Sequence, residues 1–142
     1  MAEFVANEIQ EVELGQNVLL NGSIPCNKGY VLHREGSGIV TLRGVTNSCS
    51  CFARYQVTFN GNIAVPEDGV AGEISLALAI DGEPLQTSRA RVTPAAVDEY
   101  FNTTSTAIIT VPRGCCYTVA VENTSDQAIN VQNANLAISR IA

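Results

Sequence analysis

The sequence predicts an all-β protein, a single-domain jelly-roll sandwich of about 8–10 antiparallel strands. Apolar and polar residues alternate through most of the chain, which is the two-residue period of a strand with one buried face. Turn-forming residues interrupt this alternation at short intervals. The 142 residues suit one domain, and no linker, repeat or low-complexity stretch divides them. We therefore expect one domain over 1–142.

Residues 1–20 have two interpretations. Apolar residues such as Phe4 and Val12 are interspersed with acids in this segment. The pattern suits either the first strand of the sandwich or an arm that docks on a partner.

The middle of the chain contains the clearest strands. In 74–80 the large residues alternate with Ser75, Ala77 and Ala79, so we expect both faces of this strand to be covered. Asp81-Gly82 directly afterwards predicts a hairpin with a type I′ turn, whose two central residues need positive φ. In 55–65 one face of a strand would carry the following residues: Tyr55, Val57, Phe59, Gly61, Ile63 and Val65.

The last third of the chain is expected to form one helical turn and three strands. Thr93 and Pro94 suit a helix start, so a short helical turn is predicted near 94–100. Strands are predicted over 106–111, 116–121 and 129–141. The alternation changes phase within 129–141, and a β-bulge near 133–135 accounts for the change.

Charge and composition exclude several functions. The formal net charge is −6, and seven of the eight basic residues are Arg. An acidic chain argues against a nucleic-acid partner, and the absence of a Lys-rich cluster argues against a membrane anchor. No apolar run approaches the roughly 20 residues of a membrane span. The first nine residues carry acids where a signal peptide carries bases, so we expect synthesis in the cytosol without export.

The five cysteines have more than one interpretation. Cys49 and Cys51 are two apart, whereas Cys115 and Cys116 are adjacent. This spacing fits a zinc site poorly, and we expect small buried hydrophobic residues. The alternative is a metal clip or a disulfide, in which Cys26 would pair with Cys49 or Cys51.

The chemistry of an enzyme is hard to find in this chain. His33 is the single histidine, and on a strand it would share a face with Glu35. Neither a nucleophile elbow, a phosphate loop nor a dinucleotide motif is present. We therefore expect no catalysis, no cofactor and no metal. The acidic pairs in 67–68 and 98–99 are read as solvated turns rather than calcium ligands.

Small neutral residues on the strands predict a homo-oligomer, most naturally a trimer. Charge is depleted in closely packed interfaces, and the strand over 74–80 and the last strand both lack charge on one side. The predicted interface comprises Ile129, Val131, Leu136, Ile138, Ser75, Ala77 and Ala79.

Two resemblances sharpen this expectation. Segments 116–125 and 128–141, which close with Ala-Asn-Leu-Ala-Ile-Ser-Arg-Ile, resemble the last strands of trimeric tumour-necrosis-factor/C1q-like jelly rolls. The whole chain also resembles small structural proteins of tailed phages of gut Firmicutes. That likeness lies in the His-Arg-Glu-Gly-Ser-Gly segment 33–38, the Val-Thr-Leu-Arg-Gly segment 40–44, the segment 93–101 and the Cys-Cys pair.

The resemblance implies a virion component, and the residues leave three functions to compare. The first is a homotrimeric structural protein that decorates a phage capsid or belongs to an appendage. The second is a C1q-like module that recognises a host or glycan through the loops 47–51, 66–69 and 112–114. The third, an enzyme built on His33 and Glu35, has the least support.

Overall fold

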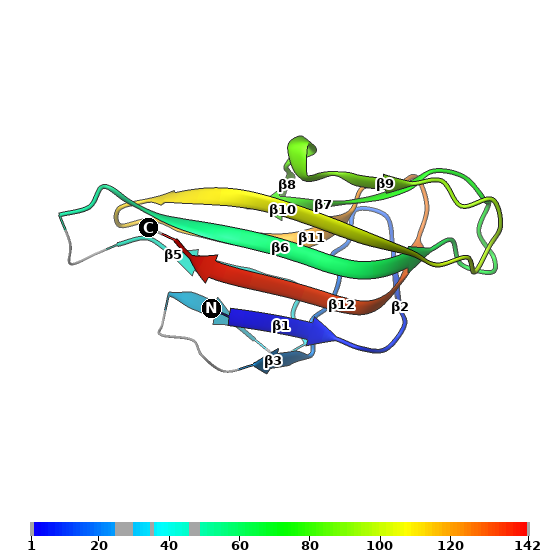
Figure 1. Ribbon diagram of the computed structural model, residues 1–142, viewed down its shortest axis with the longest axis horizontal. Coiled ribbons are helices and arrows are strands. Elements are labelled where there is room, and N and C mark those ends of the chain that lie inside the picture. The colour runs from blue at the N-terminus through cyan, green and yellow to red at the C-terminus, as the bar shows by residue number, and fades with distance from the viewer. Residues whose placement is uncertain (1, 25–29, 35, 46–48, 142) are drawn as a thin grey trace.

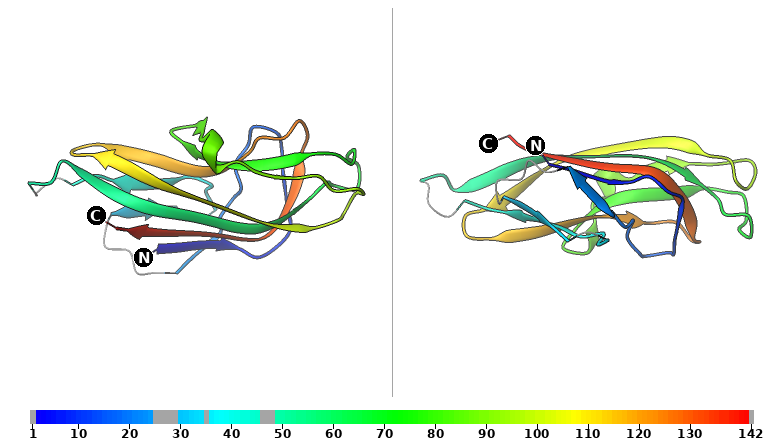
Figure 2. Two further views of the ribbon diagram at one scale, coloured as in Figure 1. Left: turned by 45° about the horizontal axis from the view of Figure 1, so that its top comes forward. Right: turned by 90° about the horizontal axis from the view of Figure 1, so that it is seen from below.

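The computed structural model describes residues 2–24, 30–34, 36–45 and 49–141, and over this range the chain forms a sandwich of two antiparallel sheets. The two layers are seen edge-on in the right-hand panel of Figure 2. We call them the β6 sheet and the β7 sheet. Their strands run mainly along the long axis of the molecule (Figure 1).

The β6 sheet contains the longest strands and has the order β10-β6-β12-β1-β3, with β2 also paired to β12. Three of its strands have 12 or 13 residues, so they span most of the molecule (Figure 1). The bounds are β1 (Ala2–Ala6), β2 (Gln10–Val12), β3 (Gly22–Ile24), β6 (Phe52–Ala64), β10 (Phe101–Pro112) and β12 (Ile129–Arg140).

The β7 sheet has shorter strands in the order β4-β5-β11-β7-β8, with β9 also paired to β7. One 3₁₀ turn, η1 (Gln86–Ser88), lies between β8 and β9. The bounds are β4 (Val31–His33), β5 (Val40–Arg43), β7 (Ile74–Ile80), β8 (Glu83–Pro84), β9 (Ala90–Val92) and β11 (Cys116–Asn123).

The apolar residues that the alternation places on one strand face form a single core between the sheets. All six residues of the predicted face in 55–65 are buried, which confirms that assignment. The same holds for Ile74, Leu76 and Leu78 on β7. Burial of apolar surface stabilises by about 25 cal/mol per Å², so this core is the main source of stability.

Two details of the backbone confirm sequence predictions. Asp81 and Gly82 have φ of 51° and 86°, as a type I′ turn requires, and they connect β7 to β8. In β12 the register shifts between Gln132 and Asn135, and Asn133 has φ of 54°. This is the predicted bulge, and it keeps the apolar residues on both sides of the shift facing the core.

Other details differ from the prediction. Twelve strands are present in the described part of the chain, against the predicted 8–10. Five of them have only two or three residues, which is too short for alternation to be a clear signal. The helical turn expected near 94–100 does not form, since the Asp98 N–H donates to the carbonyl of Val65 and Asp98 has φ of 56°. Residues 2–6 and 10–12 are strands of the β6 sheet rather than a projecting arm.

Candidate functional site

The outer face of the β6 sheet is broad and almost uncharged. Register pairing aligns outward side chains of β10, β6, β12 and β1 in rows, for example Thr106, Thr58, Ala137 and Glu3. Glu3 and Arg54 are the charged members of these rows within the described strands. Glu3 lies beside Ala137, where its carboxylate accepts from Asn135 Nδ2, and Arg54 lies near the start of β6. We call the remaining set the neutral face: Asn102, Thr104, Thr106, Ile108, Thr110, Gln56, Thr58, Asn60, Asn62, Gln132, Asn135, Ala137, Ser139 and Val5.

Hydrogen bonds between strands hold the polar side chains of the neutral face in place. The Thr58 and Thr106 hydroxyl oxygens are 3.0 Å apart. The Asn60 Oδ1 atom accepts from Asn102 Nδ2 at 2.9 Å and from Thr104 Oγ1 at 3.1 Å. Side chains already fixed in this way lose less rotamer entropy when a partner covers them.

The structure corrects the predicted oligomer interface. The four predicted residues of β12 point into the core, and each is at most 1% exposed in the single chain. They therefore offer no surface to a second copy. Sequence periodicity identified the two sides of β12, but the side that remains available is the polar one. The four residues that the structure removes from the predicted interface are Ile129, Val131, Leu136 and Ile138.

The predicted interface residues of β7 are also buried within one chain. Ser75, Ala77 and Ala79 are each 1% exposed. Arg89 lies over this side of β7, where its Nε atom donates to Ser75 Oγ and its Nη2 atom to the Thr124 carbonyl, both at 3.1 Å. This face of β7 is covered, as expected, and the chain itself covers it rather than a neighbouring copy.

A second surface lies at one end of the sandwich, where β6 begins and β10 ends. The loop after β5 and the turn before β11 meet there through backbone hydrogen bonds. Arg113 N–H donates to the Cys51 carbonyl and Gly44 N–H to the Cys115 carbonyl, each at 2.9 Å. A Cβ on Gly44 would lie 2.3 Å from the Pro112 carbonyl oxygen, so only glycine permits this approach.

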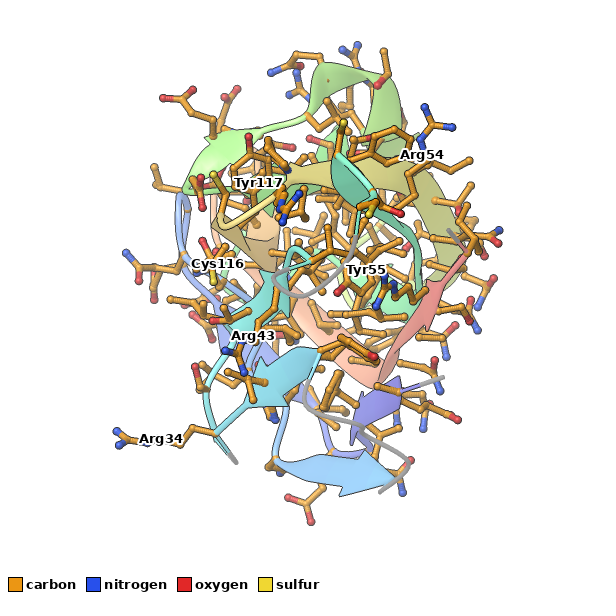
Figure 3. All side chains as sticks on the ribbon, turned by 90° about the vertical axis from the view of Figure 1, so that its left-hand side faces the viewer. Arg34, Arg43, Arg54, Tyr55, Cys116 and Tyr117 are labelled. Atoms are coloured by element: carbon orange, nitrogen blue, oxygen red, sulfur yellow. The ribbon has the colours of Figure 1, made fainter. Side chains whose placement is uncertain are left out.

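Four exposed arginines surround these loops, and we call this region the arginine end; Figure 3 looks directly at it. The Arg54 guanidinium lies 4.7 Å from the ring centre of Phe52, and that of Arg140 lies 4.5 Å from Tyr30. These are cation–π distances. The arginines are Arg43, Arg54, Arg113 and Arg140.

Tyr55 connects the two sheets beneath the arginine end. Its ring is fully buried, and its hydroxyl donates to the carbonyl of Arg43, so a side chain of β6 holds the end of β5 (Figure 3). Burial raises the pKa of Tyr55 because the phenolate is poorly solvated, while the nearby charge of Arg140 opposes that increase.

The cysteines also gather at the arginine end, and they are not buried as predicted. Cys49, Cys51, Cys115 and Cys116 are all exposed and carry free thiols. Cys26, the partner considered for a disulfide, lies outside the described residues. No group of three or more His, Cys, Asp or Glu residues within the described ranges is placed to hold a metal ion.

The residues considered for catalysis and calcium binding lie elsewhere. The His33 Nε2 atom is 2.8 Å from the Ser37 carbonyl, and the His33 ring packs 4.7 Å from that of Phe4. This contact gives His33 a structural role, while Glu35 lies outside the described residues. At the opposite end, acidic residues and two neutral ones line a cavity of about 560 Å³: Glu11, Pro66, Glu67, Asp68, Asp98 and Asn130.

Comparisons with known proteins define the class of fold. The globular domain of zebrafish complement 1qA aligns over 96% of this chain and 94% of its own, with a TM-score of 0.61 and 15% identity. Eiger TNF from S. frugiperda aligns over 100% and 92%, with a TM-score of 0.68 and 13% identity. The fold is therefore a TNF/C1q-like jelly roll, as the sequence predicted.

The comparisons by sequence yield no further relative. No family model matches the chain, and no curated protein matches it. Within the described residues, no helix is long and apolar enough to cross a membrane.

Proposed function

We propose that the protein is a non-enzymatic structural component that assembles into a homotrimer through the neutral face. The observation that carries the proposal is the near absence of charge across four adjacent strands in a chain of net charge −6. Most acidic and basic side chains lie on the loops, at the ends and on the β7 sheet. Interface cores are depleted of charge in the same way, because desolvating an unpaired ion costs several kcal/mol.

The neutral face offers a partner both shape and apolar contact. Ile108, on the edge strand β10, is 63% exposed, and Val5 and Ala137 add smaller apolar groups. Fixed Asn and Thr side chains provide hydrogen-bond donors and acceptors without a charge to desolvate. The similarity in fold to C1q and TNF domains supports a trimer with this sheet at its centre.

Within that proposal, the particular role is a capsid decoration or appendage component of a tailed phage. It rests on the phage resemblance of segments 33–44, 93–101 and 115–116. Mass spectrometry of purified phage particles would test this role. The chain is expected in every particle at a copy number divisible by three, and its absence from particles would refute the virion role while leaving the trimer intact.

Charge introduced into the neutral face tests the trimer directly. Ile108→Arg removes an exposed apolar contact and no hydrogen bond, so the single chain should fold normally. Light scattering should give three chains for the wild type and one for Ile108→Arg. Leu14→Arg is the matched control, because Leu14 is 58% exposed but lies off the β6 sheet. A wild-type monomer at micromolar concentration, or a trimer of Ile108→Arg, would contradict the proposal.

A further inference from the structure

We infer that the arginine end is a docking surface for an acidic protein, such as the shell or appendage component that carries this one. The inference rests on the proposed function for the identity of the assembly. It adds the chemistry of the partner. The surface itself is complete within one chain. Its presence can therefore be tested whether or not the trimer exists.

The segments that form the arginine end carry only positive charge. The described segments that build the arginine end, 43–45, 49–55, 112–117 and 139–141, contain four arginines and no Asp or Glu. In the sequence, the four other basic residues and all fourteen acidic residues lie outside these segments, which leaves the rest of the chain with a formal charge of −10. A local cluster of positive charge attracts an incoming acidic surface toward this end before contact.

The composition of the arginine end is that of a protein interface. Arginine and aromatic residues are enriched at interface hot spots, whereas Lys, Asp and Glu are depleted there. Here Tyr30 is 43% exposed and Phe52 is 37% exposed, and each stacks with a guanidinium. The apolar Ile141 is also exposed beside them. The arrangement provides both apolar contact and charge.

The surface is held rigid before any partner binds. Stacking on Phe52 orients the Arg54 guanidinium and leaves its planar edge able to donate two parallel hydrogen bonds to one carboxylate. The hydrogen bonds between the two loops and the Tyr55 hydroxyl fix the backbone beneath. A preorganised surface loses less entropy on binding.

A folded acidic partner fits the charge distribution better than a long polyanion. A polyanion that extends past the arginine end would run along flanks that carry the excess negative charge. A protein contact confined to the end avoids this repulsion. Phosphate polymers are therefore an alternative that the experiment must separate.

The experiment measures binding of poly-L-glutamate, in a length short enough to stay within the arginine end, to the full chain, with polyphosphate of equal charge as the competing probe. Arg54→Gln with Arg113→Gln should weaken poly-L-glutamate binding about tenfold, or 1.4 kcal/mol. The matched control, Arg34→Gln with Arg91→Gln, changes the net charge equally but away from this end, and should alter binding less than twofold. Lysine at 54 and 113 keeps the charge but loses the planar fork, so it should also weaken binding severalfold.

Each outcome decides between the interpretations. Equal losses for the two glutamine pairs, or full affinity for the lysine variant, would mean that only net charge attracts the probe and would overturn the inference. Tighter binding of polyphosphate than of poly-L-glutamate would also overturn it. Repeating the measurement in the Ile108→Arg background separates the two proposals. Retained binding by that monomer supports the docking surface even if the trimer proposal fails.

Discussion

The two outer faces of the sandwich differ although both are made of alternating strands. On the β7 sheet, the outward side chains of β7 are small and 1% exposed, and Arg89 donates to Ser75 among them. On the β6 sheet, the outward side chains are Asn, Thr and Gln that bond to one another and remain largely open. One face is closed by its own chain, and the other is open in the single chain.

This difference shows that small side chains and uncharged side chains occur on strand faces for separate structural reasons. Ala77 and Ala79 are small because nearby chain occupies the space above them. Thr58 and Asn60 are neutral without being small, and they are accessible. A lack of charge in a strand therefore indicates a contact, but burial in the single chain decides whether the contact is internal.

The largest expected effect comes from placing the same side chain on each face. Ala77→Asn buries an amide without partners in filled space and should cost about 2–4 kcal/mol of unfolding free energy. Ala137→Asn, on the half-exposed neutral face, should cost less than about 0.5 kcal/mol. Urea denaturation of both variants measures the contrast. Similar losses would show that the two faces are equally packed.

Tyr55→Phe tests the connection between the sheets and should have an intermediate effect. Loss of the hydroxyl leaves the part-buried Arg43 carbonyl without this donor, at a cost of about 1–2 kcal/mol. Because burial raises the pKa of Tyr55 above that of the unfolded chain, its stabilising contribution is present below about pH 10 and is lost as the pH rises through the folded-state pKa.

Thermal unfolding between pH 7 and pH 11 checks both parts of this expectation. The variant should be less stable than the wild type at pH 7 and should lose less stability on going to pH 11. A wild type whose stability did not fall faster than that of the variant would show that the phenol is not the group responsible.

Much of the fold could be predicted from the sequence because alternation and turn residues are local signals. The strand over 55–65, the Asp81-Gly82 hairpin and the bulge at Asn133 all rest on neighbouring residues. The failure near 94–100 has the opposite cause. The Asp98 N–H is satisfied by Val65, which is more than thirty residues away, and local propensity for a helical turn does not include that bond.

The candidate sites were less predictable, because each depends on strands far apart in the sequence. The neutral face is formed by β1, β12, β6 and β10. The Asn and Thr residues in 102–106 form part of this surface only because β10 lies beside β6. The arginine end joins Arg43, Arg54, Arg113 and Arg140 from four segments. Cysteine type favours burial, but the turns that carry Cys49 and Cys115 are surface turns.

The smallest effect concerns the charges left on the β7 sheet. Glu122 lies opposite Ala77 on β11, and partial burial, then the charge of Glu83, raises its pKa. The folded state therefore binds the proton more tightly than the unfolded chain does, and stability falls as the pH rises through the carboxyl range.

Glu122→Gln should remove this dependence and raise the midpoint of thermal unfolding at pH 7 by about 1–2 °C, as expected for a few tenths of a kcal/mol between exposed like charges. At pH 3, where the carboxyl is protonated in both states, the variant should match the wild type. Gln132→Glu supplies the reverse test, since a single carboxylate placed on the neutral face has little effect on one chain but should weaken the trimer. Equal gains from Glu122→Gln at both pH values would show that ionisation of Glu122 is not the cause.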